Sequence, residues 1–403
     1  MTVKPAQDLP YIASADALNA LCERLETVTT LAIDTEFMGE EHFIPRLELI
    51  QVAADGFAAV IDFPAVQQSG PITRFWELLC TASIEKVLHA GRQDLELFAH
   101  HAGQLPKPFF DTQIAAAMVG YGPQTAYANL VQRVQGVRLD KAHTFTNWSQ
   151  RPLSQDQLVY ALDDVKFLLP VHRHLRQKLT VMGRLEWVDE EFSRLEGSLG
   201  SQARDPQERY QRIRGWDSLK PKAAAVLRDL TAWRENEARR RNVPRGRVLR
   251  DEVLLQLARQ TPRTLEQLRG MRGMYGSEVE RNGQALLAVM QQALARPESE
   301  WPEIPRDRKP DPESTGVLEL MQAVLKARAS ADNIAPTLIA TTSDLQALID
   351  HDEVQGSEPD LPVLRGWRRQ LVGETLLSIL DGRLKVWVEP ETGKLRFGHL
   401  NHS

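Results

Sequence analysis

The segment from Leu31 to Phe37 is an apolar run that ends in two closely spaced carboxylates. Asp34 and Glu36 are two residues apart, so on a β-strand both side chains point to the same face. Like charges at this spacing repel each other, and burying them is costly unless a cation lies between them. Carboxylate oxygens are also the ligands that Mg²⁺ prefers. The segment therefore predicts half of a metal site at the edge of a buried sheet, although these residues alone fit a solvated strand end equally well.

Length and composition limit the class of protein. With 403 residues the chain is too long for one ordinary core, so we expect two or three domains. Hydrophobic residues make up 42% and charged residues 26%, and no apolar run approaches the ~20 residues that span a bilayer. The N-terminus has no signal-peptide pattern, and two cysteines, Cys22 and Cys80, are too few for a disulfide framework or a zinc site. These features predict a soluble, cytoplasmic protein with no membrane partner.

Charge is distributed unevenly along the chain. The net charge of −5 combines an acidic N-terminal part (residues 1–206, net −8), a basic middle part (207–292, net +8) and an acidic C-terminal part (293–403, net −5). A basic module between two acidic ones is the footprint of a polyanionic partner. The middle part is therefore where we expect nucleic acid to bind.

The order of expected elements predicts an α/β domain followed by helical modules. Three strands come early in the chain, two of them joined by an Asp55-Gly56 turn, and strands then alternate with helices. A Gly/Ser stretch from Gly197 to Ser201 predicts the end of the first domain. The domains expected are an α/β domain at 1–206, a basic helical module at 207–295, a Pro-rich charged linker at 296–312, and a second helical module with a C-terminal hairpin at 313–403.

More acidic groups stand at the ends of expected elements. Asp94 falls in the first turn of a helix that follows a short buried strand. Tyr160 and Asp164 are spaced i, i+4 on a helix that Ser154 caps, so they face the same way one turn apart. The neighbouring Asp163 would point about 100° away from Asp164, and its role stays open.

The order of these residues resembles the three exonuclease motifs of the DEDD superfamily, in its tyrosine subclass. The motifs are Asp34-Thr35-Glu36, the run from His89 to Asp94, and the run from Tyr160 to Asp164. Within the superfamily the chain resembles ribonuclease D, because residues 213–292 look like an HRDC module and 313–381 look like a second, diverged copy. The resemblance covers nearly the whole chain. It implies an α/β, ribonuclease H-like exonuclease domain with a mixed central sheet, followed by two all-helical HRDC-like domains.

The resemblance also implies a function. It is that of a metal-dependent 3′→5′ exoribonuclease, which releases 5′-mononucleotides and trims the 3′ ends of structured RNA precursors such as tRNA. Two divalent cations, Mg²⁺ or Mn²⁺, would be its cofactors, with no small-molecule cofactor. Asp34 would bridge both cations, Glu36 and Asp164 would complete the site of the attacking water, and Asp94 would serve the second cation. Tyr160 would orient the water.

Two other functions stay open at this point. Carboxylate chemistry does not read the 2′-hydroxyl, so a DNA exonuclease of the same superfamily is compatible with the motifs. A non-catalytic RNA-binding protein is the second alternative, and the intact carboxylate set argues against it.

Aromatic and basic residues near the motifs are candidate RNA contacts. Phe37 and Met38 follow Glu36 directly and would stack on the terminal base, although core packing is an equal alternative. Trp148 and Arg151 lie in a segment that resembles the family's W-x-x-R-P-L loop and would line the path of the strand. A buried Trp148 at a helix entry is the other interpretation.

The middle part carries a dense arginine cluster. Phosphate contact is its functional interpretation and predicts salt-sensitive binding. Docking on the acidic nuclease domain is the alternative. The second helical module has no such cluster, so we expect it to position the first. The cluster comprises Arg239, Arg240, Arg241, Arg245, Arg247 and Arg250.

Overall fold

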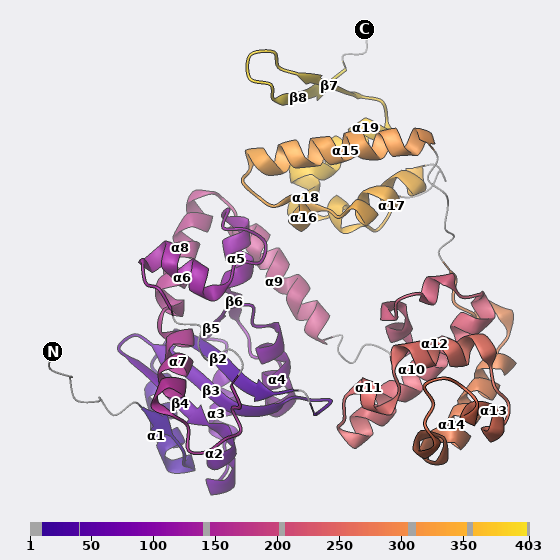
Figure 1. Cartoon of the computed structure of the whole chain (residues 1–403). Coiled ribbons are helices and arrows are strands. Elements are labelled where there is room, and N and C mark those ends of the chain that lie inside the picture. Colours follow the sequence, from indigo (N-terminus) through magenta and orange to yellow (C-terminus); the bar gives the residue numbers. More distant parts are fainter. Residues whose placement is uncertain are drawn as a thin grey trace.

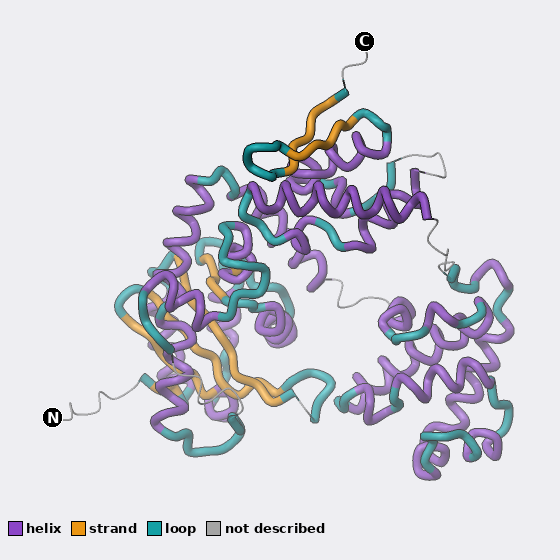
Figure 2. The backbone as a smooth tube through the Cα atoms, turned by 45° about the horizontal axis from the view of Figure 1, so that its top comes forward, coloured by secondary structure: helices purple, strands orange, loops and turns teal. Residues whose placement is uncertain are grey.

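The computed structural model shows three parts in chain order (Figure 1). An α/β domain is followed by a helical middle module and by a helical C-terminal module that ends in a hairpin. Within the described part of the chain, the strands belong to the first domain and to that hairpin (Figure 2). The structure describes residues 10–39, 41–139, 146–200, 206–304, 312–352 and 358–400.

The first domain is built on a six-stranded mixed sheet. Its strands are β1 (Tyr11–Ile12), β2 (Thr30–Met38), β3 (Arg46–Ala54), β4 (Phe57–Asp62), β5 (Glu85–Leu88) and β6 (Phe109–Asp111). They lie in the order β1-β4-β3-β2-β5-β6. β2, β3 and β4 form an antiparallel meander, whereas β1, β5 and β6 each run parallel to a neighbour. The predicted mixed central sheet is confirmed.

Local sequence explains the meander. β3 and β4 are joined at Asp55 and Gly56, and Gly56 has a φ of +87°, a conformation that favours glycine. All but the first residue of β3 is buried, because this strand lies inside the sheet with helices against both faces. The pairing of β2 with β3 shifts between Glu36 and Phe37, which is the signature of a β-bulge at the end of the acidic motif.

Helices cover both faces of the sheet. Leu31 and Ile33 of β2 pack with α1, α3 and α4, whereas Ala32 faces the opposite core, which contains residues of α5 to α9. The strand periodicity of two therefore directs alternate residues of β2 to different helix layers. The helices are α1 (Ala15–Leu25), α2 (Phe63–Ser69), α3 (Thr73–Leu79), α4 (Arg92–Ala102), α5 (Thr112–Met118), α6 (Tyr127–Gln135), α7 (Gln155–Lys166), α8 (Leu168–Val181) and α9 (Leu185–Gly200).

The last helix of the first domain, α9, extends further than the sequence predicts. Gly197 and Ser198 were expected in a connecting stretch, yet α9 continues through them. The hydroxyl of Ser198 donates to the carbonyl of Leu195 (2.7 Å), and the next residue, Leu199, is buried in the core. Tertiary packing therefore overrides the low helix propensity of the Gly/Ser stretch. Its last residue, Ser201, lies outside the described residues.

The middle module has a core of its own. Leu227 and Leu230 of its longest helix pack on Leu254, Leu257 and other residues of the same module. Its elements are the 3₁₀ segments η2 (Pro206–Arg212) and η3 (Trp216–Ser218), the helices α10 (Pro221–Arg241), α11 (Arg245–Val248), α12 (Asp251–Gln260), α13 (Leu265–Arg269) and α14 (Gly276–Ala295), and the short η4 (Glu298–Glu300). Residues 305–311 of the predicted linker after it lie outside the described residues.

The C-terminal module contains one long helix, several shorter ones and the predicted hairpin. The hairpin pairs β7 (Leu384–Val388) with β8 (Leu395–His399) in antiparallel register. No described helix of the chain is both long and apolar enough to cross a membrane. The helical elements are α15 (Pro312–Ala331), α16 (Pro336–Ile339), α17 (Thr342–Asp352), η5 (Pro362–Leu364), α18 (Gly366–Arg368), the π-helical η6 (Arg369–Gly373) and α19 (Glu374–Leu380).

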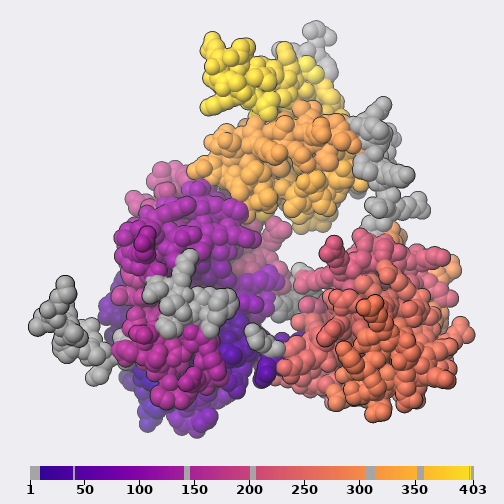
Figure 3. Space-filling view, in the orientation of Figure 1, coloured from indigo at the N-terminus to yellow at the C-terminus, as the bar shows by residue number. Residues whose placement is uncertain are grey.

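The C-terminal module shares a core with the first domain. Buried residues of α8 and α15 belong to one continuous apolar cluster. Trp367 is 2% exposed, and its ring stacks on that of Trp187 with centroids 5.1 Å apart. Arg368 pairs with Glu191 of α9 beside this stack. In Figure 3 the orange C-terminal module lies directly against the N-terminal domain.

The middle module meets the first domain through a much smaller contact. The loop between β2 and β3 reaches α10 and α11, where the amide of Ile44 donates to Asn242 Oδ1 (3.2 Å). The guanidinium of Arg245 lies 4.5 Å from the ring centroid of Phe43. The two helical modules are thus attached to the first domain in different ways, one by a common core and one by a loop.

Candidate active site

Three carboxylates converge where β2 faces α7. Asp34 and Glu36 lie on the same face of β2, as their spacing predicts, and Asp164 comes from α7. Ligand atoms of the three side chains all lie within 4.8 Å of one another. Among the described residues, these three side chains form the one cluster of acidic, histidine or cysteine groups that could hold a metal ion.

A capped helix positions Asp164. The hydroxyl of Ser154 accepts from the amide of Gln157 (3.2 Å), and the Gln157 side chain accepts from the amide of Ser154 (2.8 Å), a complete capping box. Leu162 and Val165 are buried against the sheet and hold the other face of α7. Tyr160 lies one turn before Asp164.

Asp94 approaches from the opposite side of the sheet. Thr35 points away from Asp34 and Glu36, and its hydroxyl donates to Asp94 Oδ1. Asp94 is 7% exposed and stands in the first turn of α4, directly after β5. This explains why it is set back from the close group of three carboxylates while its charge still acts on Asp34.

Two family models match the chain. Residues 10–180 match a 3′–5′ exonuclease model, which covers all of the carboxylates described above. Residues 223–290 match a model of the HRDC domain, which lies in the middle module. The matched HRDC segment does not include the C-terminal module, so its origin as a second, diverged copy stays a prediction.

Full-length relatives decide the family. The chain is 38% identical to ribonuclease D of Acidiphilium cryptum over 95% of its length and 96% of the relative, and 40% identical to that of Zymomonas mobilis over 94% and 96%. A crystal structure of Escherichia coli RNase D, described as an exoribonuclease involved in structured RNA processing, aligns with a TM-score of 0.79 and 30% identity over 93% of this chain and 99% of that one. The chain belongs to the ribonuclease D family. It is a 3′→5′ exoribonuclease of the ribonuclease D type.

The electrostatics of the carboxylate group fit the metal dependence of this exonuclease family. Burial and the charges of Asp94, Asp164 and Glu36 raise the pKa of Asp34 well above its usual range. Burial and neighbouring carboxylates raise the pKa of Glu36 to about 8 and that of Asp164 to about 7. Burial raises the pKa of Asp94 to about 6. Such shifts show uncompensated negative charge, which a divalent cation would neutralise.

Gln51 is a residue near the site that the sequence analysis missed. It pairs directly with Asp34 across β2 and β3, so both side chains share a face. Gln51 is fully buried, yet neither end of its amide has a hydrogen-bond partner in the described structure. Buried polar groups are normally satisfied, so the orphaned amide beside Asp34 fits a hydrated cation at this position. Its place in an apolar β3 offered no signal in the sequence.

Neighbouring acids have structural partners. Asp111 accepts hydrogen bonds from the amides of Ala90 (3.1 Å), Gly91 (2.9 Å) and Gln113 (2.8 Å), so it holds two turns together. Asp163 points to Lys166 instead of the carboxylate group, with an oxygen to nitrogen distance of 3.9 Å. The geometry therefore brings Asp164, and not Asp163, to Asp34.

Tyr127 is a second residue that the motifs did not reveal. Its hydroxyl donates to the backbone carbonyl of Asp163 (3.2 Å). Burial and the charges of Asp164 and Asp34 raise its pKa. Tyr127 therefore braces the turn of α7 that carries Asp164 and stays protonated there.

The candidate RNA contacts beside the site mostly have internal partners. Trp148 is 4% exposed and packs on Tyr160, with centroids 6.1 Å apart, as the packing interpretation requires. Arg151 donates to both oxygens of Asp62, through Nε (2.5 Å) and Nη2 (3.0 Å), and so ties its loop to β4. Phe37 and Met38 are half-buried at the edges of two cores. The RNA contacts of Phe37, Met38, Trp148 and Arg151 stay predictions. Residues 140–145 of the loop before Trp148 lie outside the described residues.

The predicted arginine cluster is largely engaged within the protein. Arg240 pairs with Glu237 (2.7 Å), Arg245 pairs with Glu235 (2.7 Å), and Arg241 lies 4.0 Å from Glu237. The guanidinium of Arg239 lies 5.7 Å from the ring centroid of Phe43, and Arg247 lies 3.7 Å from Glu41 of the same loop. Both the docking and the RNA-binding interpretations therefore have supporting geometry, because several of these side chains also keep exposed surface.

Proposed function

We propose that this exoribonuclease trims the 3′ ends of structured RNA precursors, such as those of tRNA, and releases 5′-mononucleotides with two bound divalent cations. The observation that carries the proposal is the convergence of Asp34, Glu36 and Asp164 within 4.8 Å, with Asp94 behind them. The printed description of the Escherichia coli relative, structured RNA processing, supports the substrate class. Because such precursors are processed in the cytoplasm, we infer that the enzyme acts there.

The carboxylates would hold the cations. Asp34, whose pKa is raised by all three other acids, would contact both ions, while Glu36 and Asp164 would hold one ion and Asp94 would serve the other. Bound Mg²⁺ or Mn²⁺ would lower the pKa of the attacking water and stabilise the leaving 3′ oxygen. The raised pKa values of these side chains describe the site without cations, and ionised carboxylates are the form that binds.

Tyr160 would orient the attacking water. It projects from α7 one turn before Asp164, so its hydroxyl lies on the same side of the helix as the carboxylate. A phenol hydroxyl can both donate and accept a hydrogen bond, so Tyr160 would serve as a hydrogen-bonding partner of the water. The Trp148 ring packs against Tyr160 and limits its movement.

The middle module would bind the RNA backbone. Its exposed arginines provide sequence-independent contacts, and such contacts weaken as salt concentration rises. The C-terminal module would hold the nuclease domain from the far side through the shared core, and it lacks a comparable arginine cluster in its described residues.

Matched RNA and DNA oligonucleotides with a 3′ overhang test the proposal. In Mg²⁺, we expect the RNA to be shortened from its 3′ end with release of 5′-mononucleotides, and we expect Asp34→Ala to abolish the release. Faster degradation of the DNA would overturn the substrate class. Full activity of Asp34→Ala would overturn the site.

A further inference from the structure

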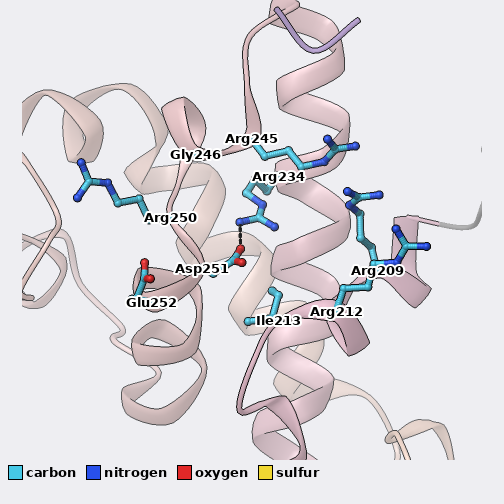
Figure 4. Close-up of a pocket in the computed structure, with 9 residues that line it drawn as sticks. All are labelled: Arg209, Arg212, Ile213, Arg234, Arg245, Gly246, Arg250, Asp251 and Glu252. Carbon is cyan, nitrogen blue, oxygen red and sulfur yellow. Dashed lines mark hydrogen bonds and ion pairs between the residues drawn. The ribbon is translucent and has the colours of Figure 1, made fainter. Parts of the chain in front are cut away.

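The middle module contains an arginine pocket that the sequence cluster did not predict. It has a volume of about 430 Å³ and lies where η2, α10, α11 and the start of α12 meet (Figure 4). Figure 4 shows the side chains of Arg209, Arg212 and Arg245 extending toward one another, while Arg250 turns away. Arg234 lies deeper, beside Asp251. Two of these residues, Arg209 and Arg212, precede the matched HRDC segment.

The carboxylates near the pocket do not balance its positive charge. Glu235 is shared by Arg209 (3.0 Å) and Arg245 (2.7 Å). Among the residues that the structure describes, no carboxylate forms an ion pair with Arg212. Burial and the positive charges of Arg245, Arg212 and Arg234 lower the pKa of Arg209, although the negative charge of Glu235 raises it. The pocket therefore keeps a local excess of positive charge.

A buried donor in the pocket lacks an acceptor. Arg234 is 4% exposed, and its Nη1 donates to the carbonyl of Leu249 (3.1 Å) and to Asp251 Oδ1 (2.5 Å). Its Nε has no hydrogen-bond partner within the described structure. Leaving a buried charged donor unpaired is unfavourable, so the geometry favours a ligand that brings its own acceptor oxygens.

We propose that this pocket binds a phosphate group of the RNA strand. Phosphate oxygens accept the parallel hydrogen bonds that guanidinium groups donate, and an anion there would balance the excess charge. The proposal rests on the proposed function, since it assigns a place to the same RNA. Binding in one pocket with defined arginines differs from binding over a general basic surface.

A neighbouring cleft gives the strand a route to the pocket. Arg209, Arg212 and Arg245 also line a cleft of about 920 Å³ between the middle module and the nuclease domain. On the nuclease side the cleft is lined by Arg92 and Gln93, which directly precede Asp94 on α4. The cleft thus connects the arginine pocket with the helix that carries a carboxylate of the site.

The test measures RNA binding without hydrolysis. In full-length Asp34→Asn protein, Arg212→Ala removes an exposed arginine with no ion pair to lose, so we expect its melting temperature to stay unchanged. We expect affinity for a labelled RNA with a 3′ overhang to fall roughly five- to tenfold and the salt slope of binding to decrease by about 1. Arg272→Ala is the control, because Arg272 is exposed on the α13–α14 loop and lines no part of the pocket.

The remaining outcomes separate the possible sources of phosphate. Equal affinity and salt slope for Arg212→Ala and Arg272→Ala would overturn the proposal. Binding of 5′-AMP that depends on Arg212, with RNA affinity unchanged, would overturn it in favour of a free nucleotide. The two proposals can fail separately. If Arg212→Ala weakens RNA binding but the unaltered enzyme degrades no RNA, the phosphate pocket stands and the proposed function is overturned.

Discussion

The nuclease site gathers carboxylates and the middle module gathers arginines. Charges within each group repel one another, and the two groups differ in whether neighbouring side chains of opposite charge compensate them. Around Asp34 the described residues offer no cationic side chain in ion-pair contact, and the pKa values of the acids rise. Several arginines of the module, in contrast, are paired with Glu235, Glu237 or Asp251. The first group therefore depends on cations from solution, whereas the second is stable by itself and offers RNA only its surplus charge.

The largest effect is expected from removing the central carboxylate. Asp34→Asn keeps the shape of the side chain but takes away the charge that both cations would share. We expect the rate of mononucleotide release to fall roughly 10³-fold or more, because losing a single preorganised hydrogen-bond donor already costs about 10²- to 10³-fold in other enzymes. RNA binding through the arginines should persist, as anisotropy at low salt can show. Loss of RNA binding together with activity would contradict the separation of the two groups.

Removing the Tyr160 hydroxyl should have the next largest effect. Tyr160→Phe keeps the packing on Trp148 but cannot orient the water, so we expect kcat to fall about 10²-fold while KM stays nearly constant. Steady-state kinetics with short RNA measures both. A raised KM with unchanged kcat would show that Tyr160 binds substrate and does not act on the water. Tyr127→Phe is a control that removes a hydroxyl bonded to the backbone of α7.

Metal ions should stabilise the protein in a pH-dependent way. The folded pKa values of about 8 for Glu36, about 7 for Asp164 and about 6 for Asp94 exceed the ordinary values near 4. The metal-free folded state thus binds more protons than the unfolded state between about pH 4 and 8, and its free energy of unfolding falls as pH rises through that window.

Differential scanning fluorimetry with and without Mg²⁺ can check this expectation. The rise in melting temperature caused by Mg²⁺ should be larger at pH 8 than at pH 5.5, because binding requires ionised carboxylates. At a Mg²⁺ concentration of 100 times Kd the stabilisation is about 2.7 kcal/mol. In Asp34→Asn the Mg²⁺ effect should shrink at both pH values. An equal effect at both pH values in the unaltered protein would contradict the link to these carboxylates.

The smallest effect is expected at the surface of the arginine cluster. Arg240 is exposed, and its partner Glu237 retains Arg241 nearby, so Arg240→Ala should leave the melting temperature nearly unchanged. If Arg240 exchanges Glu237 for phosphate, the salt slope of RNA binding should fall by about 1 with little change in specificity. An unchanged slope would assign Arg240 to the protein surface alone.

The parts of the site that follow local periodicity could be predicted from the sequence. The common face of Asp34 and Glu36 follows from strand geometry, and the alignment of Tyr160 with Asp164 follows from the helical turn. The strand pairings around the Asp55-Gly56 turn follow in the same way.

The rest depends on contacts between segments far apart in the chain. The Thr35 hydroxyl meets Asp94 across 59 residues, and Ile44 meets Asn242 across 198. The pairing of Glu235 with both Arg209 and Arg245 leaves no periodic signal, so the sequence revealed an arginine cluster but not which arginines keep unbalanced charge. The position of Gln51 beside Asp34 could not be predicted either, because it depends on the register between β2 and β3.

The most direct test of the two-cation site is anomalous scattering from Mn²⁺ in crystals of the full-length protein grown with 5′-AMP. We expect two peaks roughly 3.5–4 Å apart, both within coordination distance of Asp34, with Glu36 and Asp164 at one peak and Asp94 near the other. The amide of Gln51 should lie within reach of the hydration shell. A single peak, or none near Asp34 at saturating Mn²⁺, would contradict the account.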